Sequence, residues 1–118
     1  MTNKIYSLMV GRYQPLHAGH IKLIRTVLSE GKNVCVALRD TGVNKQNPYT
    51  YFERCEMFKK EFKAEMLLGK IKIIEIPDIE EVVWGRGVGW GRREIKLSKE
   101  IENISATKIR NENKKNKK

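Results

Sequence analysis

The first half of the chain alternates short apolar runs with segments whose apolar residues recur at helical spacing. The runs Ile5–Val10 and Val34–Leu38 are typical of buried strands, and the second is typical of a central parallel strand. The segment between them predicts a helix up to about Glu30, with Gly31 at its C-cap. Its helically spaced apolar residues are Ile21, Leu23, Ile24, Val27 and Leu28. This order predicts a strand–helix–strand unit with a right-handed crossover.

A second helix and a third strand follow. Thr50–Glu53 has the pattern of a capping box, so we expect a helix that begins at Thr50 and ends at Gly69. The apolar face of this helix is formed by Tyr51, Cys55, Phe58, Phe62 and Met66. The run Ile71–Ile76 then predicts the third strand, which Pro77 breaks.

The rest of the chain carries weaker signals. Val82–Trp84 and Glu94–Leu97 indicate a fourth and a fifth strand, and Ser105 is a candidate N-cap for a last helix. Together the elements predict a single α/β domain over residues 1–112. Its parallel five-stranded sheet has the order 3-2-1-4-5, with helices on both faces. We expect the lysine-rich residues 113–118 to form a disordered basic tail.

Composition and charge indicate which classes of partner the protein is expected to bind. The 118-residue chain has a net charge of +10, which suits polyanions such as nucleotides and pyrophosphate. It has no RNA-binding aromatic signature, helix-turn-helix pattern or zinc finger, so nucleic acid is not the expected partner. It has no apolar stretch of membrane-spanning length and no signal peptide, so we expect a cytoplasmic protein. Cys35 and Cys55 fit no metal pattern, and we expect neither a protein-held metal nor a disulfide.

Candidate chemistry gathers at Gly11–His20, between the first strand and the first helix. Ligands bind at this place in parallel α/β sheets, and the free N–H groups at a helix start favour phosphate. The spacing of His17 and His20 can direct two imidazoles at one point, which suits a transition state with extra charge on phosphate oxygens. Gly19 lets a ligand approach the backbone, and Gly11 permits a tight turn. The competing interpretation makes both histidines ordinary polar loop residues.

Other candidates lie in loops and at helix starts. Lys45, after the second strand, suits substrate or triphosphate oxygens, although a solvated surface lysine fits equally well. In the glycine-rich loop Gly85–Gly91, Arg86 suits a phosphate and Trp90 suits stacking on a base, whereas we interpret Trp84 as a core residue. We interpret Arg54 as holding a loop to the second helix rather than as binding substrate.

Three segments resemble signatures of one family. Gly11–His20 (GRYQPLHAGH) resembles the GRFQPxHxGH signature of the nucleotidyltransferase superfamily, the adenylyl- and cytidylyltransferases with an HxGH motif. Ile104–Arg110 (ISATKIR) is similar to the ISxTxIR signature of the same family. Asn47–Arg54 (NPYTYFER) resembles the NPFTxxER stretch of nicotinamide-mononucleotide adenylyltransferases. The resemblance covers nearly the whole chain and implies a Rossmann-like nucleotidyltransferase domain over residues 1–112.

The resemblance also implies a reaction and a set of site residues. A nucleotidyl group would pass from an NTP to the phosphate of a small acceptor such as nicotinamide mononucleotide, and pyrophosphate would leave. The implied catalytic residues are His17, His20 and Arg110. The implied nucleotide-binding residues are Gly11, Arg12, Tyr13, Gln14, Gly19, Ile104, Ser105 and Thr107, and the acceptor-binding candidates are Lys45, Arg86 and Trp90. The implied cofactor is Mg²⁺, bound mainly through the NTP phosphates.

Several alternatives stay open. Arg12–Pro15 looks more like the adenylyl branch than the cytidylyl branch, which favours AMP transfer over CMP transfer. The alternative is a cytidylyltransferase that acts on a phosphorylated polyol or amino alcohol such as glycerol 3-phosphate. A second alternative is a non-catalytic nucleotide-binding module whose basic surface binds nucleic acid or a partner enzyme. For the segment at Ser105 alone, the alternative is a plain capped helix with a solvated Arg110. A chain of this size is also compatible with a homodimer.

Overall fold

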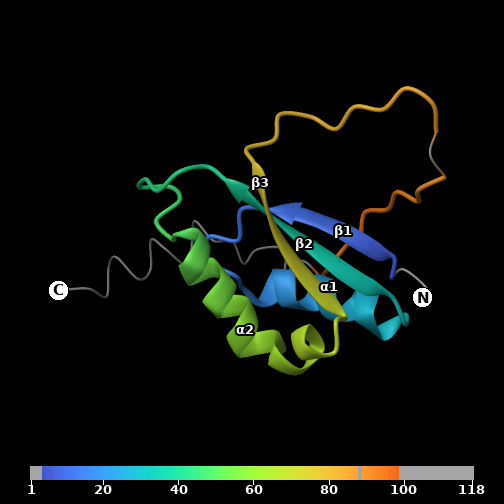
Figure 1. Cartoon of the computed structure of the whole chain (residues 1–118), viewed down its shortest axis with the longest axis horizontal. Coiled ribbons are helices and arrows are strands. Elements are labelled where there is room, and N and C mark those ends of the chain that lie inside the picture. The colour runs from blue at the N-terminus through green and yellow to red at the C-terminus, as the bar shows by residue number, and fades with distance from the viewer. Residues whose placement is uncertain (1–3, 88, 99–118) are drawn as a thin grey trace.

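The computed structural model describes residues 4–87 and 89–98. In this part of the chain, strands and helices alternate in the order expected from the sequence (Figure 1). The elements are β1 (Tyr6–Gly11), α1 (Ala18–Ser29), β2 (Asn33–Asp40), α2 (Tyr51–Leu67) and β3 (Ile71–Pro77). None of the helices in these residues is both long enough and apolar enough to cross a membrane.

The three strands form one parallel sheet in the order β1-β2-β3. Leu8 is paired with Cys35, and Cys35 is paired with Lys72. The 3-2-1 part of the predicted strand order is therefore confirmed. All three strands point their carboxyl ends toward one edge of the sheet, where α2 also begins (Figure 1).

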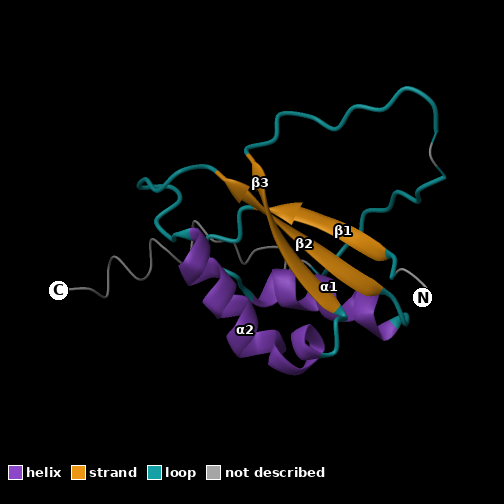
Figure 2. Cartoon of the chain, in the orientation of Figure 1, coloured by secondary structure: helices purple, strands orange, loops and turns teal. Residues whose placement is uncertain are grey.

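Both helices cover the same face of the sheet (Figure 2). Alternate residues of β2 are buried under them in a single hydrophobic core. That core contains Tyr13, Ile24, Val27, Val34, Val36, Leu38, Phe58, Phe62 and Ile71. On the other face, Tyr6, Leu8 and Val10 of β1 are exposed. Successive right-handed crossovers in one direction place their helices on one side, which accounts for this arrangement. The predicted last helix lies outside the described residues, so the expectation of helices on both faces stays a prediction.

The two later strands are also absent from the described residues. Val82–Trp84 and Glu94–Leu97 have no strand structure, so these two predictions are wrong. Residues 78–81 alone separate β3 from Val82, and a parallel strand needs a crossover of about a dozen residues or more. Ile95 nevertheless packs against the core, which accounts for the alternating pattern around it. The predicted last helix and basic tail lie outside the described residues.

Local signals explain where α2 begins and where both helices end. Thr50 accepts a hydrogen bond from the backbone N–H of Glu53, and the Glu53 carboxylate accepts one from the N–H of Thr50. This is the predicted capping box. After the helices, Gly31 has φ 78° and Gly69 has φ 73°, a region in which glycine is favoured.

Candidate functional site

The turn between β1 and α1 is built around the buried side chain of Tyr13. Its ring lies 4.5 Å from the His20 ring and 5.1 Å from the Phe58 ring, between centroids, and its hydroxyl donates to the Met9 carbonyl. A Cβ atom on Gly11 would lie 3.0 Å from the Tyr13 ring. Gly11 therefore makes room for this ring, whereas the positive φ in the turn, 50°, belongs to Tyr13 itself.

The two histidines cap α1 by a reciprocal pair of hydrogen bonds. His17 is the N-cap residue, and its Nδ1 accepts from the Gly19 N–H at 3.1 Å. His20 Nδ1 in turn accepts from the His17 N–H at 3.2 Å. The two rings are stacked, with 3.7 Å between centroids and 19° between planes. The spacing thus brings the two imidazoles together, and their aim at one phosphate stays a prediction.

These hydrogen bonds fix the protonation pattern of both imidazoles. A neutral imidazole carries one proton, and a nitrogen that accepts a backbone N–H cannot hold it. Because both Nδ1 atoms accept, the proton of each ring is on Nε2. The stacked pair therefore presents two Nε2–H donors, which suit the oxygens of one phosphate group.

Burial keeps the pair neutral. It lowers the pKa of His20 to about 3, with a further contribution from the neighbouring His17. Burial also lowers the pKa of His17, although its own backbone hydrogen bond opposes the effect. At neutral pH the histidines are hydrogen-bond donors rather than cations, so positive charge at the site has to come from arginine or lysine.

The loop that follows β2 is fastened to the turn by polar side chains. The buried Gln14 amide donates to the Tyr49 carbonyl at 2.9 Å and accepts from the Tyr49 N–H at 2.8 Å. Arg12 donates to the side-chain oxygen of the buried Asn47 at 3.3 Å. Since Tyr13 and Gln14 are buried, their side chains support the turn, and any contact of theirs with a nucleotide would come from the backbone.

Arg54 lies beneath the same loops. Its Nη1 donates to the carbonyls of Arg12 and Arg39, at 3.1 and 2.8 Å, and its Nε donates to the Thr50 carbonyl at 3.3 Å. The structural role expected for Arg54 is confirmed. Sequence reasoning missed Asn47 and the exchange of bonds between Gln14 and Tyr49, although Asn47 and Tyr49 belong to the NPYTYFER stretch.

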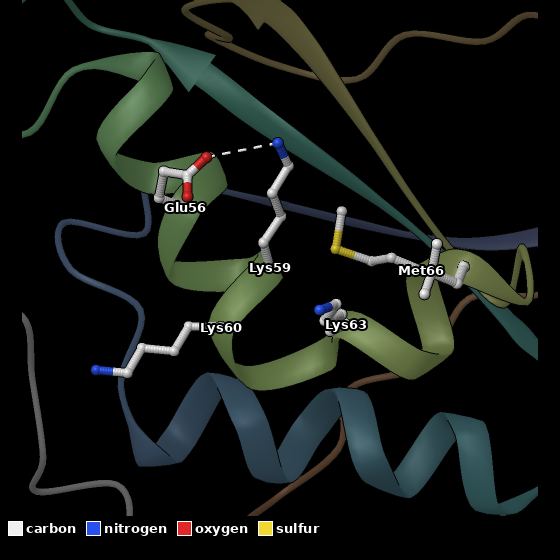
Figure 3. Close-up of a pocket in the computed structure, with 6 residues that line it drawn as sticks. Glu56, Lys59, Lys60, Lys63 and Met66 are labelled. Atoms are coloured by element: carbon white, nitrogen blue, oxygen red, sulfur yellow. Dashed lines mark hydrogen bonds and ion pairs between the residues drawn. The ribbon is translucent and has the colours of Figure 1, made fainter.

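The other candidates lie in other loops or outside the described residues. Lys45 is exposed in the loop after β2, and Arg86 and Trp90 are exposed in the chain that follows β3. The interpretation of Trp84 as a core residue is wrong, because its side chain is exposed in the same segment, beneath Arg92. Ile104, Ser105, Thr107 and Arg110 lie outside the described residues. A surface pocket on α2 contains none of the predicted site residues (Figure 3). It is lined by Glu56, Lys59, Lys60, Lys63, Met66 and Leu67.

The described residues do not gather the side chains of a protein-held metal site. Within residues 4–87 and 89–98, no group of three or more histidine, cysteine, aspartate or glutamate residues could hold a metal ion. Metal binding by this part of the chain alone therefore has no support. The expectation that Mg²⁺ is bound through the NTP phosphates stays a prediction.

Comparison with known proteins adds family evidence to this geometry. Residues 8–65 match the cytidylyltransferase-like family. The chain is also 35% identical over 81 residues to a nicotinamide-nucleotide adenylyltransferase of Thermococcus kodakarensis, an alignment that covers 65% of this chain and 43% of the relative. It is 31% identical over 83 residues to the enzyme of the same name from Pyrococcus abyssi, covering 68% of this chain and 45% of the relative.

The matched region includes the histidine pair, the loop after β2 and Arg54, but it spans less than half the length of these relatives. The resemblance expected from the GRYQPLHAGH and NPYTYFER segments is confirmed. Through residues 8–65, the chain resembles the cytidylyltransferase-like members of the nucleotidyltransferase superfamily.

Proposed function

We propose that this protein is an adenylyltransferase that transfers AMP from ATP to the phosphate of a small acceptor, with nicotinamide mononucleotide as the first candidate. The observation that carries the proposal is the stacked His17–His20 pair, which offers two neutral Nε2–H donors where a parallel strand leads into a helix. The relatives named nicotinamide-nucleotide adenylyltransferase support the choice of donor and acceptor.

In the proposed reaction, a phosphate oxygen of the acceptor forms a bond to the α-phosphorus of ATP. The bond from that phosphorus to the oxygen bridging to the β-phosphate breaks, and pyrophosphate leaves with the electron pair. His17 and His20 donate to α-phosphate oxygens, whose charge grows in the transition state. Catalysis then consists of positioning and electrostatic stabilisation, and no protein nucleophile takes part.

Other residues take the predicted supporting roles. Ser105, Thr107 and Arg110 would hold the leaving pyrophosphate, together with Lys45. Arg86 and Trp90 would bind the acceptor. Mg²⁺ carried by the triphosphate would neutralise part of its charge. The cytidylyltransferase alternative, with CTP and glycerol 3-phosphate, differs in the base and the acceptor but uses the same histidine pair.

The test is pyrophosphate release in the presence of Mg²⁺, with ATP and CTP each crossed against nicotinamide mononucleotide, glycerol 3-phosphate and a pool of phosphorylated metabolites. We expect release with ATP and one acceptor, and a loss of about 10²–10³-fold in turnover for His20→Ala. Circular dichroism should show that the variant is folded. Near-normal turnover of His20→Ala would exclude this mechanism.

The same panel separates the non-catalytic alternative. A nucleotide-binding module would bind ATP without releasing pyrophosphate with any acceptor. Release with CTP and glycerol 3-phosphate but not with ATP would favour the cytidylyltransferase.

A further inference from the structure

Arg54 is an arginine in the interior of the protein. Its exposed fraction is 3%, although it belongs to the first turns of α2, near the edge of the sheet where the strands end. Charged residues are rarely buried to this extent unless other groups satisfy them. The groups that bind its guanidinium therefore indicate the role of this side chain.

Its hydrogen bonds join three segments that are distant in sequence. Arg12 belongs to the turn before α1, Arg39 lies near the end of β2, and Thr50 is the N-cap of α2. Each segment offers a backbone carbonyl to the same side chain. The loop 44–50 is also tied to the turn by Gln14 and Arg12. Arg54 thus fixes the relative positions of the turn that leads into α1, the end of β2 and the start of α2.

Among the described residues, no carboxylate forms an ion pair with Arg54. In contrast, Arg25, Arg39 and Arg93 each pair with an aspartate or glutamate. Backbone carbonyls satisfy its N–H groups but leave a net positive charge. Such a charge, shielded from water, acts more strongly on a nearby anion than an exposed lysine does.

We propose that Arg54 is a positioning residue for polyphosphate binding. It holds together the turn before α1, the end of β2 and the start of α2, and it supplies a buried positive charge where these three segments meet. The inference rests on the proposed function only in taking the bound anion to be the triphosphate of the nucleotide or the pyrophosphate product. It does not require that transfer occurs.

The experiment measures dissociation constants for pyrophosphate and ATP by titration calorimetry in the full chain. Arg54→Lys keeps the charge but removes the planar fork that reaches several carbonyls, and Arg54→Met removes both. The control variants are Arg25→Lys and Arg25→Met. Arg25 is a half-exposed arginine of α1 that packs on Phe62 and pairs with Glu61 and Glu65, so its loss disturbs the contact between the helices and not the turn.

We expect Arg54→Lys to weaken pyrophosphate binding about tenfold and Arg54→Met to weaken it further, while both Arg25 variants stay within about twofold of the wild type. Hydrogen exchange should become faster at the Tyr49 amide in Arg54→Lys, because Tyr49 precedes the Thr50 carbonyl that Arg54 binds and its N–H bonds to Gln14 of the turn. If Arg54→Met does not fold, the dissociation constants and the hydrogen exchange of Arg54→Lys test the inference by themselves.

Binding of pyrophosphate and ATP within twofold of wild type by folded Arg54→Lys would overturn the inference while leaving the proposed transferase intact. A wild type that binds pyrophosphate but transfers nothing would remove the proposed function, and the comparison of variants would still decide the role of Arg54. A wild type that binds neither ligand would overturn both.

Discussion

His17 and His20 perform two tasks with one set of atoms. Their Nδ1 atoms satisfy backbone N–H groups at the start of α1, and this leaves their Nε2–H groups for a ligand. The sequence predicted the convergence of the two rings from their spacing. It did not predict the cap, because serine, threonine, aspartate and asparagine are the usual N-cap residues, and a pair of histidines gives no such signal.

The buried neutral state of His20 predicts a loss of stability in acid. Its pKa is about 3 in the folded protein, against the ordinary value of 6.5, so only the unfolded chain takes up this proton between those values. The contribution of His20 to stability is complete above pH 6.5 and falls as the pH drops from 6.5 toward 3. Urea unfolding of wild type and His20→Gln at several pH values should show a steeper acid loss in the wild type.

His17 and the carboxylates are present in both proteins, so their contribution to the acid loss of stability is common to the two curves. Parallel curves for the two proteins would mean that His20 is not held neutral by the fold.

At the scale of elements, prediction succeeded where the signal is local. The strands β1 to β3 and the helices α1 and α2 follow from apolar runs, helical spacing and caps within a few residues of each element. It failed at Val82–Trp84 and Glu94–Leu97, because a strand-like composition forms a strand only where a neighbouring strand pairs with it. For Val82–Trp84, residues 78–81 are too few for a parallel crossover. The burial of Arg54 could not be predicted from the sequence either, because its carbonyl partners come from three separate segments.

The capping box of α2 gives a prediction for this element. Thr50→Ala removes the side-chain oxygen that accepts from the Glu53 N–H, and we expect a loss of about 1 kcal/mol in the free energy of unfolding. Thr26→Ala is the control, because the Thr26 hydroxyl donates to Lys22 within α1 and caps nothing. Urea denaturation followed by circular dichroism measures both, and equal effects would contradict the role of the cap.

At the scale of the whole molecule, the core and the candidate site share residues. Phe58 is packed inside the core and touches Tyr13, whose other side meets His20. One layer of aromatic rings therefore connects the inner face of α2 to the histidine pair. The contacts of Phe58 with Tyr13 and of Tyr13 with His20 therefore restrain the His20 ring, in addition to its hydrogen bond to the His17 N–H.

Two phenylalanines of α2 provide a matched pair to test this packing. Phe58 is 0% exposed and Phe52 is 79% exposed. We expect Phe58→Ala to reduce the free energy of unfolding by about 3–5 kcal/mol, because it leaves a cavity beneath Tyr13. Phe52→Ala should change it by about 0.5 kcal/mol or less. Denaturant midpoints give both values, and a mild effect at Phe58 would show that the core does not depend on this ring.

The exposed tryptophans have a practical consequence for such measurements. Trp84 is 51% exposed and Trp90 is 81% exposed, and these are both of the tryptophans in the chain. The native protein should therefore fluoresce at the long wavelengths typical of indole in water, and unfolding should shift its emission little. Because both indoles are exposed in the segment after β3, tryptophan fluorescence also reports on this segment. A blue shift of the emission on adding nucleotide or acceptor would show that the indoles become shielded from water when the ligand binds.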